Sequence, residues 1–185
     1  MNGRSLGLTV GLLTAVMAVA VGCTWAFRAM RTVMDVGGTC ASGGPYVSAQ
    51  PCPEGAWTIG VAIPMLILAA LAGSVLAGLL RAPVLLPIMW AALFGALGWN
   101  FWDYGLRESG NAGFIVCGVV FWLMALPAVL VVLFGGAAAR SLRNLARGAT
   151  LASAPAGDRV AWLSAYALVG AAGAYFGSGW WEAII

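Results

Sequence analysis

The chain has 185 residues, of which 62% are hydrophobic and only 8% are charged. Because a soluble domain usually contains about 25% charged residues, this composition excludes an ordinary water-soluble globular protein. The net charge is +3, and the chain contains no His, the commonest proton shuttle and metal ligand. All of its basic residues are Arg, which together with the many Ala and Gly residues is typical of a GC-rich bacterial genome.

Several uncharged runs are long enough to span a membrane as α-helices. They cover residues 5–27, 57–80, 84–102, 112–134 and 160–181. At about 1.5 Å per residue, the first run reaches about 34 Å, which exceeds the hydrocarbon thickness of roughly 30 Å. The sequence therefore predicts an all-α integral membrane protein, a single polytopic domain over residues 1–185. The last run has the weakest hydropathy, so the predicted bundle has five transmembrane helices or, alternatively, four.

The first run could also be mistaken for a secretory signal. Arg4 precedes it, and the residues up to Cys23 resemble a lipoprotein cleavage box in which Cys23 would carry the lipid. However, the run is longer than the apolar part of a typical signal peptide. In addition, Ala20 stands where such boxes favour Leu. These features favour a retained transmembrane helix.

The longest polar interruption lies between the first two runs, in a loop predicted over residues 28–56. Its central part is rich in Gly and Pro, which disfavour a continuing helix. The loop also carries Cys40 and Cys52, for which we predict a disulfide. Closing a loop of this size contributes about 3 kcal/mol on chain-entropy grounds.

The arginines are distributed unequally between the two ends of the predicted bundle. With the N-terminus inside, the inner segments hold Arg4, Arg81, Arg140, Arg143, Arg147 and Arg159, whereas the outer segments hold Arg28, Arg31 and Arg107. Since positive residues favour the cytoplasm, we expect a multi-pass protein of the bacterial plasma (inner) membrane with a cytoplasmic N-terminus. The cysteine loop is then extracytoplasmic, in a compartment where disulfides persist.

Two pairs of glycines have the spacing of a small-xxx-small motif, which lets helices approach closely. They are Gly7 with Gly11 and Gly173 with Gly177. In a chain with 26 Gly, such matches also arise by chance.

Residues 137–159 are predicted as a cytoplasmic helix and linker. Arg140, Arg143 and Arg147 are spaced three and four apart and so share one helix face. Each arginine near an anionic membrane contributes about 1 kcal/mol, so we expect this face to contact anionic lipid at the inner leaflet. A docking patch for a cytoplasmic partner is the alternative, and nothing else in the sequence points to nucleic acid.

Aromatic and polar residues cluster at the end of the third run. The cluster consists of Trp99, Asn100, Trp102 and Asp103. It could hold a cationic or lipid-headgroup ligand at the outer surface, although an aromatic belt beside a helix-end acid is the simpler interpretation. On the same rim, Arg28 and Arg31 could form ion pairs. The candidate acidic partners are Asp103 and Glu182.

The two remaining cysteines, Cys23 and Cys117, are expected roughly 6 and 7 Å below the outer ends of their helices, at about 1.5 Å per residue. In quinone-linked thiol oxidases, a cysteine pair in a loop exchanges electrons with a cysteine pair in the membrane, and the arrangement predicted here resembles theirs. This chain lacks the Cys-x-x-Cys motif of those enzymes. Under that hypothesis Cys23 and Cys117 exchange with Cys40 and Cys52, and quinone is the cofactor. Otherwise the two cysteines are small buried hydrophobes or a static cross-link.

No Asp or Glu lies in the middle of a predicted span, which argues against proton-coupled transporters and pumps. The sequence also contains no Ser/His/Asp set, no phosphate-binding Gly loop and no metal-ligand cluster. We therefore expect a non-enzymatic accessory protein without a cofactor, which presents its braced loop to a membrane or extracytoplasmic partner or to a second copy. A membrane thiol-disulfide oxidoreductase is the first alternative, and a subunit of a small channel or transporter is the second.

Overall fold

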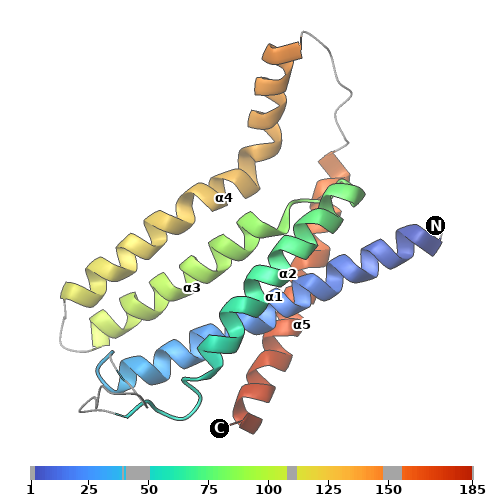
Figure 1. The fold of residues 1–185 in the computed structure, drawn as a ribbon. Helices are drawn as coiled ribbons and strands as arrows, with labels where there is room; N and C mark the ends of the chain where they lie inside the picture. Colours follow the sequence, from blue (N-terminus) through green and yellow to red (C-terminus); the bar gives the residue numbers. More distant parts are fainter. Residues whose placement is uncertain (1–2, 39, 41–50, 108–111, 148–155, 185) are drawn as a thin grey trace.

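The computed structural model describes residues 3–38, 40, 51–107, 112–147 and 156–184, without the side chains of Arg4 and of residues 135–158. Within these ranges the chain forms the helices α1 (Gly3–Asp35), α2 (Thr58–Leu80), α3 (Leu85–Arg107), α4 (Ala112–Arg147) and α5 (Ala156–Ile184) (Figure 1). Each of these five helices is long and apolar enough to cross a membrane. The predicted all-α architecture with five such helices is therefore confirmed.

Helix α1 is the centre of the bundle. It packs against α2, α3 and α5, while α3 also contacts α2 and pairs closely with α4. In the described part of the chain, no Cα atom of α5 lies within 8 Å of α3 or α4, and none of α1 lies within 8 Å of α4. Figure 1 shows α3 and α4 side by side, whereas α5 crosses α1 at an angle. The N-terminus and the α2–α3 turn lie toward one end of the bundle, and the C-terminus lies at the other.

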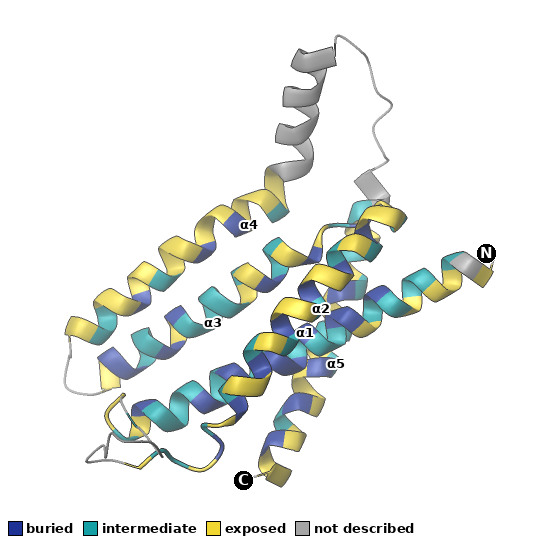
Figure 2. Cartoon of the chain, in the orientation of Figure 1, coloured by how far each residue is buried: buried dark blue, intermediate teal, exposed yellow. Residues whose placement is uncertain are grey.

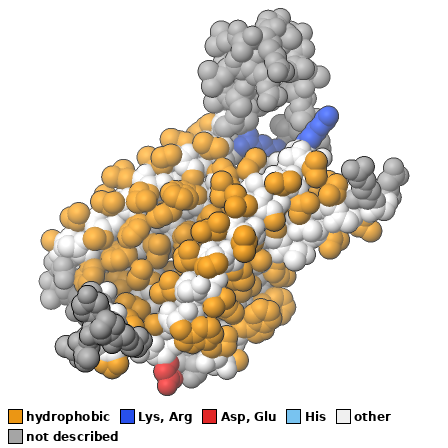
Figure 3. Space-filling view, viewed as in Figure 1, with side chains coloured by type: hydrophobic (Ala, Val, Ile, Leu, Met, Phe, Trp, Pro, Cys, Tyr) orange, Lys and Arg blue, Asp and Glu red, His pale blue; other side chains and the backbone are white. Residues whose placement is uncertain are grey.

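Large hydrophobic side chains cover the face of the molecule that Figure 3 shows, and Figure 2 marks exposed residues along the described helices. Leu68 is 67% exposed and Leu168 is 74% exposed, whereas the buried residues of α1 are mainly Ala and Val. The charged side chains visible in Figure 3 lie toward the two ends of this apolar body. Soluble monomers rarely expose apolar surface of this extent, so the exterior fits a multi-pass membrane protein.

Helix α1 is longer than its uncharged run, although the sequence predicted a loop after that run. Arg28 and Arg31 continue the helix because each has a carboxylate partner on another helix. Helix α1 ends at Asp35, and Gly37, two residues later, has a φ of 96°. The N–H of Gly38 then donates to the carbonyl of Val33 at 2.9 Å, which completes a Schellman cap.

Helices α3 and α4 also continue further than the sequence predicted. The third run was predicted to end at residue 102, but α3 extends to Arg107, whose Nε lies 3.1 Å from the Asp103 carboxylate one turn earlier. Helix α4 continues without a break to Arg147, where a separate helix was expected after residue 134. By contrast, α2 matches its prediction to within one residue, and it ends in a short turn at Arg81.

Glycines allow α1 and α5 to approach closely. A Cβ at Gly173 would stand 2.8 Å from the Cβ of Ala20, and a Cβ at Gly177 would stand 3.2 Å from the Cα of Val21. The first distance is shorter than real Cβ contacts, so position 173 requires Gly, whereas a side chain at Gly177 would force its neighbours to shift by a few tenths of an ångström. A Cβ at Gly7, in the other predicted motif, would meet no heavy atom within 4 Å.

Candidate functional site

A polar cluster joins α1 to α3 toward the end of the bundle that carries the disulfide. Arg31 of α1 forms an ion pair with Asp103 of α3 and donates a hydrogen bond from Nη1 to the Asn100 Oδ1 at 3.2 Å. The Arg31 and Asp103 side chains are only 25% and 17% exposed. The guanidinium also lies over the rings of Phe27 and Tyr104, at centroid distances of 5.8 and 5.3 Å. Arg31 therefore connects two helices through several simultaneous contacts.

Asn100 is fully buried, and both ends of its amide are used. Its Oδ1 accepts from Arg31, and its Nδ2 donates to the Phe27 carbonyl at 3.1 Å. No buried side-chain polar atom lacks a hydrogen-bond partner in the described residues. Because a buried amide without partners costs free energy, Asn100 favours the one register of α3 against α1 that supplies both bonds.

The residues predicted as an outer ligand site do not face one common space. Asn100 and Asp103 point toward α1, where Arg31 binds them. Trp102 points toward α4, and its ring centroid lies 5.2 Å from that of Trp122. Trp99 is 54% exposed. A ligand at this place would have to displace interhelical contacts, and its binding stays a prediction.

A second ion pair lies on the same rim. Arg28 Nη2 of α1 lies 3.7 Å from Glu182 Oε1 of α5, and these two side chains are 41% and 70% exposed. The prediction that Arg28 and Arg31 form ion pairs with the carboxylates of Asp103 and Glu182 is therefore confirmed. Because the Arg28 pair is exposed, it contributes far less than the Arg31 pair.

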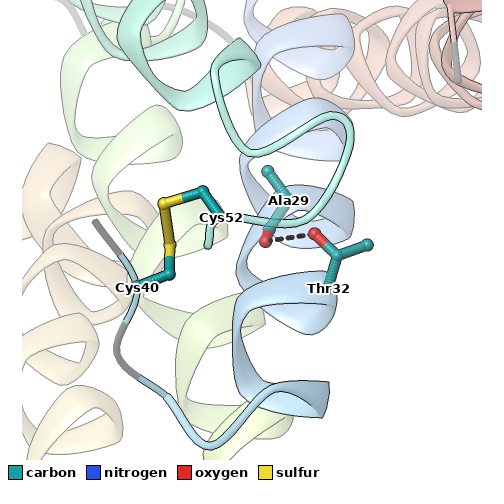
Figure 4. Close-up of a disulfide and its surroundings, with 4 residues drawn as sticks. All are labelled: Ala29, Thr32, Cys40 and Cys52. Carbon is teal, nitrogen blue, oxygen red and sulfur yellow. Dashed lines mark hydrogen bonds between the residues drawn. A yellow bond between two sulfur atoms is a disulfide. The ribbon is translucent and has the colours of Figure 1, made fainter. Parts of the chain in front are cut away.

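Cys40 and Cys52 form a disulfide that ties the end of α1 to the segment before α2 (Figure 4). Their Cα atoms are 4.8 Å apart. Figure 4 shows the bond beside the last turns of α1, where the Thr32 hydroxyl donates to the Ala29 carbonyl at 2.9 Å. The predicted disulfide is thus present, while residues 41–50 of the loop that it closes lie outside the described residues.

Cys23 and Cys117 both carry free thiols. Cys23 lies on α1 and is partly buried, whereas Cys117 is exposed on α4. Since no Cα atom of α1 lies within 8 Å of a described α4 residue, the two cysteines are too far apart to be bridged as they stand. An electron relay through them would require the helices to rearrange.

The predicted lipid-contacting face of Arg140, Arg143 and Arg147 lies outside the residues whose side chains the structure describes. All three residues belong to the helical backbone of α4. Their contact with the inner leaflet remains a prediction.

The sequence did not predict a cleft of about 520 Å³ between α3 and α5, with α1 as its floor. The cleft exists because α5 crosses α1 and diverges from α3. Its lining is almost entirely apolar and includes Val19 and Phe27 of α1, Ala92 of α3 and Gly170 of α5.

Two hydrogen bonds cross the end of the cleft that lies near the α2–α3 turn. The Tyr166 hydroxyl donates to the Pro83 carbonyl at 3.0 Å, and the Arg159 guanidinium donates to the Val132 carbonyl. Tyr166 and Val132 also belong to the lining of the cleft. The cleft is therefore lined by apolar residues, and the positively charged Arg159 guanidinium lies at one end of it.

No protein family model matches the chain, and no curated protein or solved structure is significantly similar to it. A functional assignment therefore depends on the residues of this chain alone.

Proposed function

We propose that this chain is a multi-pass protein of the bacterial plasma (inner) membrane and that its N-terminus lies in the cytoplasm. Helices of sufficient length and an apolar exterior support the membrane placement. The excess of arginines in the segments at the N-terminal end supports the orientation. In addition, the three arginines at the opposite end each have a carboxylate partner within 4.0 Å.

The orientation predicts which cysteines a reagent outside the cell can reach. In intact cells, we expect a membrane-impermeant maleimide to label Cys40 and Cys52 only after reduction, because a disulfide presents no thiolate to the reagent. Cys23 and Cys117 are internal controls, since they lie on apolar helix segments and should require a permeant reagent. Peptide mass spectrometry measures each site. Labelling of Cys40 only after cell lysis would contradict the proposed orientation, whereas labelling in intact cells without reduction would contradict the disulfide.

We propose further that the protein is a non-enzymatic accessory subunit whose disulfide-braced end binds a protein partner. The Cys40–Cys52 disulfide is the observation that carries this proposal, because it ties the chain just after α1 to the segment just before α2. A depression of about 580 Å³ lies beside the bond and is lined by both cysteines, Val33 and Trp57. Trp57 is 61% exposed, and exposed aromatic residues are enriched at protein interfaces.

A photo-crosslinking residue tests this surface in cells. Placed at Glu54, which is exposed beside the disulfide, it should capture one discrete partner or a second copy of the chain. Placed at Leu79, which is 63% exposed at the other end of α2, it should not capture that species. The double change Cys40→Ser/Cys52→Ser in the Glu54 variant should reduce capture several-fold. Equal capture with and without the disulfide would argue against a role for the braced surface.

The thiol-disulfide oxidoreductase has one observation in its favour, because Cys23 lines an apolar cleft that is large enough for a quinone ring. However, its second membrane thiol, Cys117, lies on a helix that does not approach α1. A change in the redox state of Cys40 and Cys52 in cells after Cys23→Ala would favour this alternative over the accessory role.

A further inference from the structure

We infer that the cleft between α3 and α5 binds an acyl chain of an anionic phospholipid, whose headgroup Arg159 holds. The inference depends on the proposed membrane placement but not on the partner of the disulfide-braced end. It assigns a ligand site to a part of the molecule remote from the cysteine loop.

The size and the chemistry of the cleft fit a hydrocarbon chain. Its volume of about 520 Å³ falls within the range of roughly 300–1,000 Å³ that is typical of ligand sites. The few polar side chains in its lining already have partners: the Tyr166 hydroxyl donates to Pro83, and the Thr24 hydroxyl donates to the Ala20 carbonyl at 2.9 Å. The cleft therefore offers a polar ligand little to bond with, whereas apolar burial favours an acyl chain.

The charge at the end of the cleft specifies the headgroup. A guanidinium has five N–H donors, and Arg159 uses one of them on the Val132 carbonyl. Among the side chains that the structure describes, no carboxylate lies within 4.0 Å of Arg159, in contrast to the three outer arginines. Among the described side chains, none claims the remaining donors of Arg159, whose guanidinium adjoins the apolar cleft through Val132. In the proposed orientation it faces the inner leaflet, which carries anionic lipids.

Two pairs of matched variants test the site in the full-length protein. Gly170→Leu should fill the cleft without a clash at its Cβ, because no heavy atom lies within 4 Å of that position. Gly179→Leu is its control, since Gly179 is equally open but does not line the cleft. Arg159→Gln removes the charge, and Arg81→Gln removes another arginine near the same end of the bundle.

The measurement is native mass spectrometry after extraction from bilayers of phosphatidylglycerol and phosphatidylcholine in equal parts. The unmodified protein and both control variants should retain phosphatidylglycerol, and Gly170→Leu should lose most of it. Arg159→Gln should lower the preference for phosphatidylglycerol over phosphatidylcholine about fivefold, the factor expected for one arginine at an anionic surface. Equal retention by Gly170→Leu and Gly179→Leu, or an unchanged preference in Arg159→Gln, would overturn the inference.

A second measurement needs no substitution. Added phosphatidylglycerol should slow the alkylation of Cys23, which lines the cleft, by a membrane-permeant maleimide, but should not slow that of Cys117. Equal protection by phosphatidylcholine or by a neutral quinone would assign the cleft to uncharged hydrophobic molecules and would overturn the anionic-lipid assignment. A protein that passes the labelling test of orientation but retains no lipid contradicts only the present inference.

Discussion

Arg31→Ala should lower the free energy of unfolding by about 2–3 kcal/mol. The substitution removes the ion pair with Asp103 and also the hydrogen bond to Asn100, which is fully buried. Asp103 keeps its contact with Arg107, so the carboxylate is not left without a partner. The Asn100 Oδ1 loses the donor that satisfies it, and this unsatisfied buried acceptor accounts for much of the expected cost. Reversible unfolding in mixed micelles gives the measurement.

Arg28→Ala is the matched control, one turn earlier on the same helix. Its ion pair with Glu182 is longer, at 3.7 Å, and both side chains are more exposed, so we expect a loss below about 0.5 kcal/mol. Arg31→Lys should fall between the two, because an ammonium group cannot present the planar fork that reaches Asn100 and Asp103 together. Equal losses for Arg28→Ala and Arg31→Ala would show that the polar cluster does not hold α1 against α3.

The helices long and apolar enough to span a membrane could be predicted because an uncharged stretch of sufficient length is a property of the sequence itself. The second run, 57–80, differs from α2 (Thr58–Leu80) by a single residue. The first and third runs were cut at charged residues, because a charge in an apolar helix is unfavourable unless it is paired. The pairs that keep Arg31 and Asp103 helical join residues far apart in the chain, and this information is not local.

One local signal for the end of α1 was available. A pair of glycines after a helical run is typical of a Schellman cap, and Gly37 and Gly38 form that cap here. The prediction instead placed both glycines inside the loop over residues 28–56. The cap predicts the end of α1 more accurately than the first arginine does.

The direction of individual side chains could not be predicted for α3. Asn100, Trp102 and Asp103 fall within one turn, and the sequence grouped them as one ligand site. In the structure they divide between α1 and α4, because α3 packs between these two helices. The cleft could not be predicted for a similar reason, because its width depends on the angle at which α5 crosses α1. The spacing of Gly173 and Gly177 indicates that α5 packs closely against another helix, but it does not identify that helix.

Gly118→Ala should destabilise the protein by about 1–3 kcal/mol, the usual cost of overpacking. A Cβ at Gly118 of α4 would stand 2.9 Å from the carbonyl oxygen of Gly98 and 3.0 Å from the backbone nitrogen of Trp102, both on α3. Backbone atoms cannot move aside as the end of a side chain can. The added methyl group can therefore be accommodated only if α3 and α4 separate.

Gly95→Ala is the control with the opposite expected sign. No heavy atom lies within 4 Å of a Cβ at Gly95, and Ala is more favourable than Gly inside a helix by about 0.5–1 kcal/mol, so this change should be neutral or stabilising. In Gly118→Ala, the separation of α3 and α4 should also weaken two hydrogen bonds between these helices. The Trp122 indole donates to the Gly95 carbonyl at 3.3 Å, and the Trp90 indole donates to the Met124 carbonyl at 3.1 Å. Unfolding free energies and tryptophan emission measure both effects. If Gly118→Ala stabilised the protein as Gly95→Ala does, the close contact between α3 and α4 would be refuted.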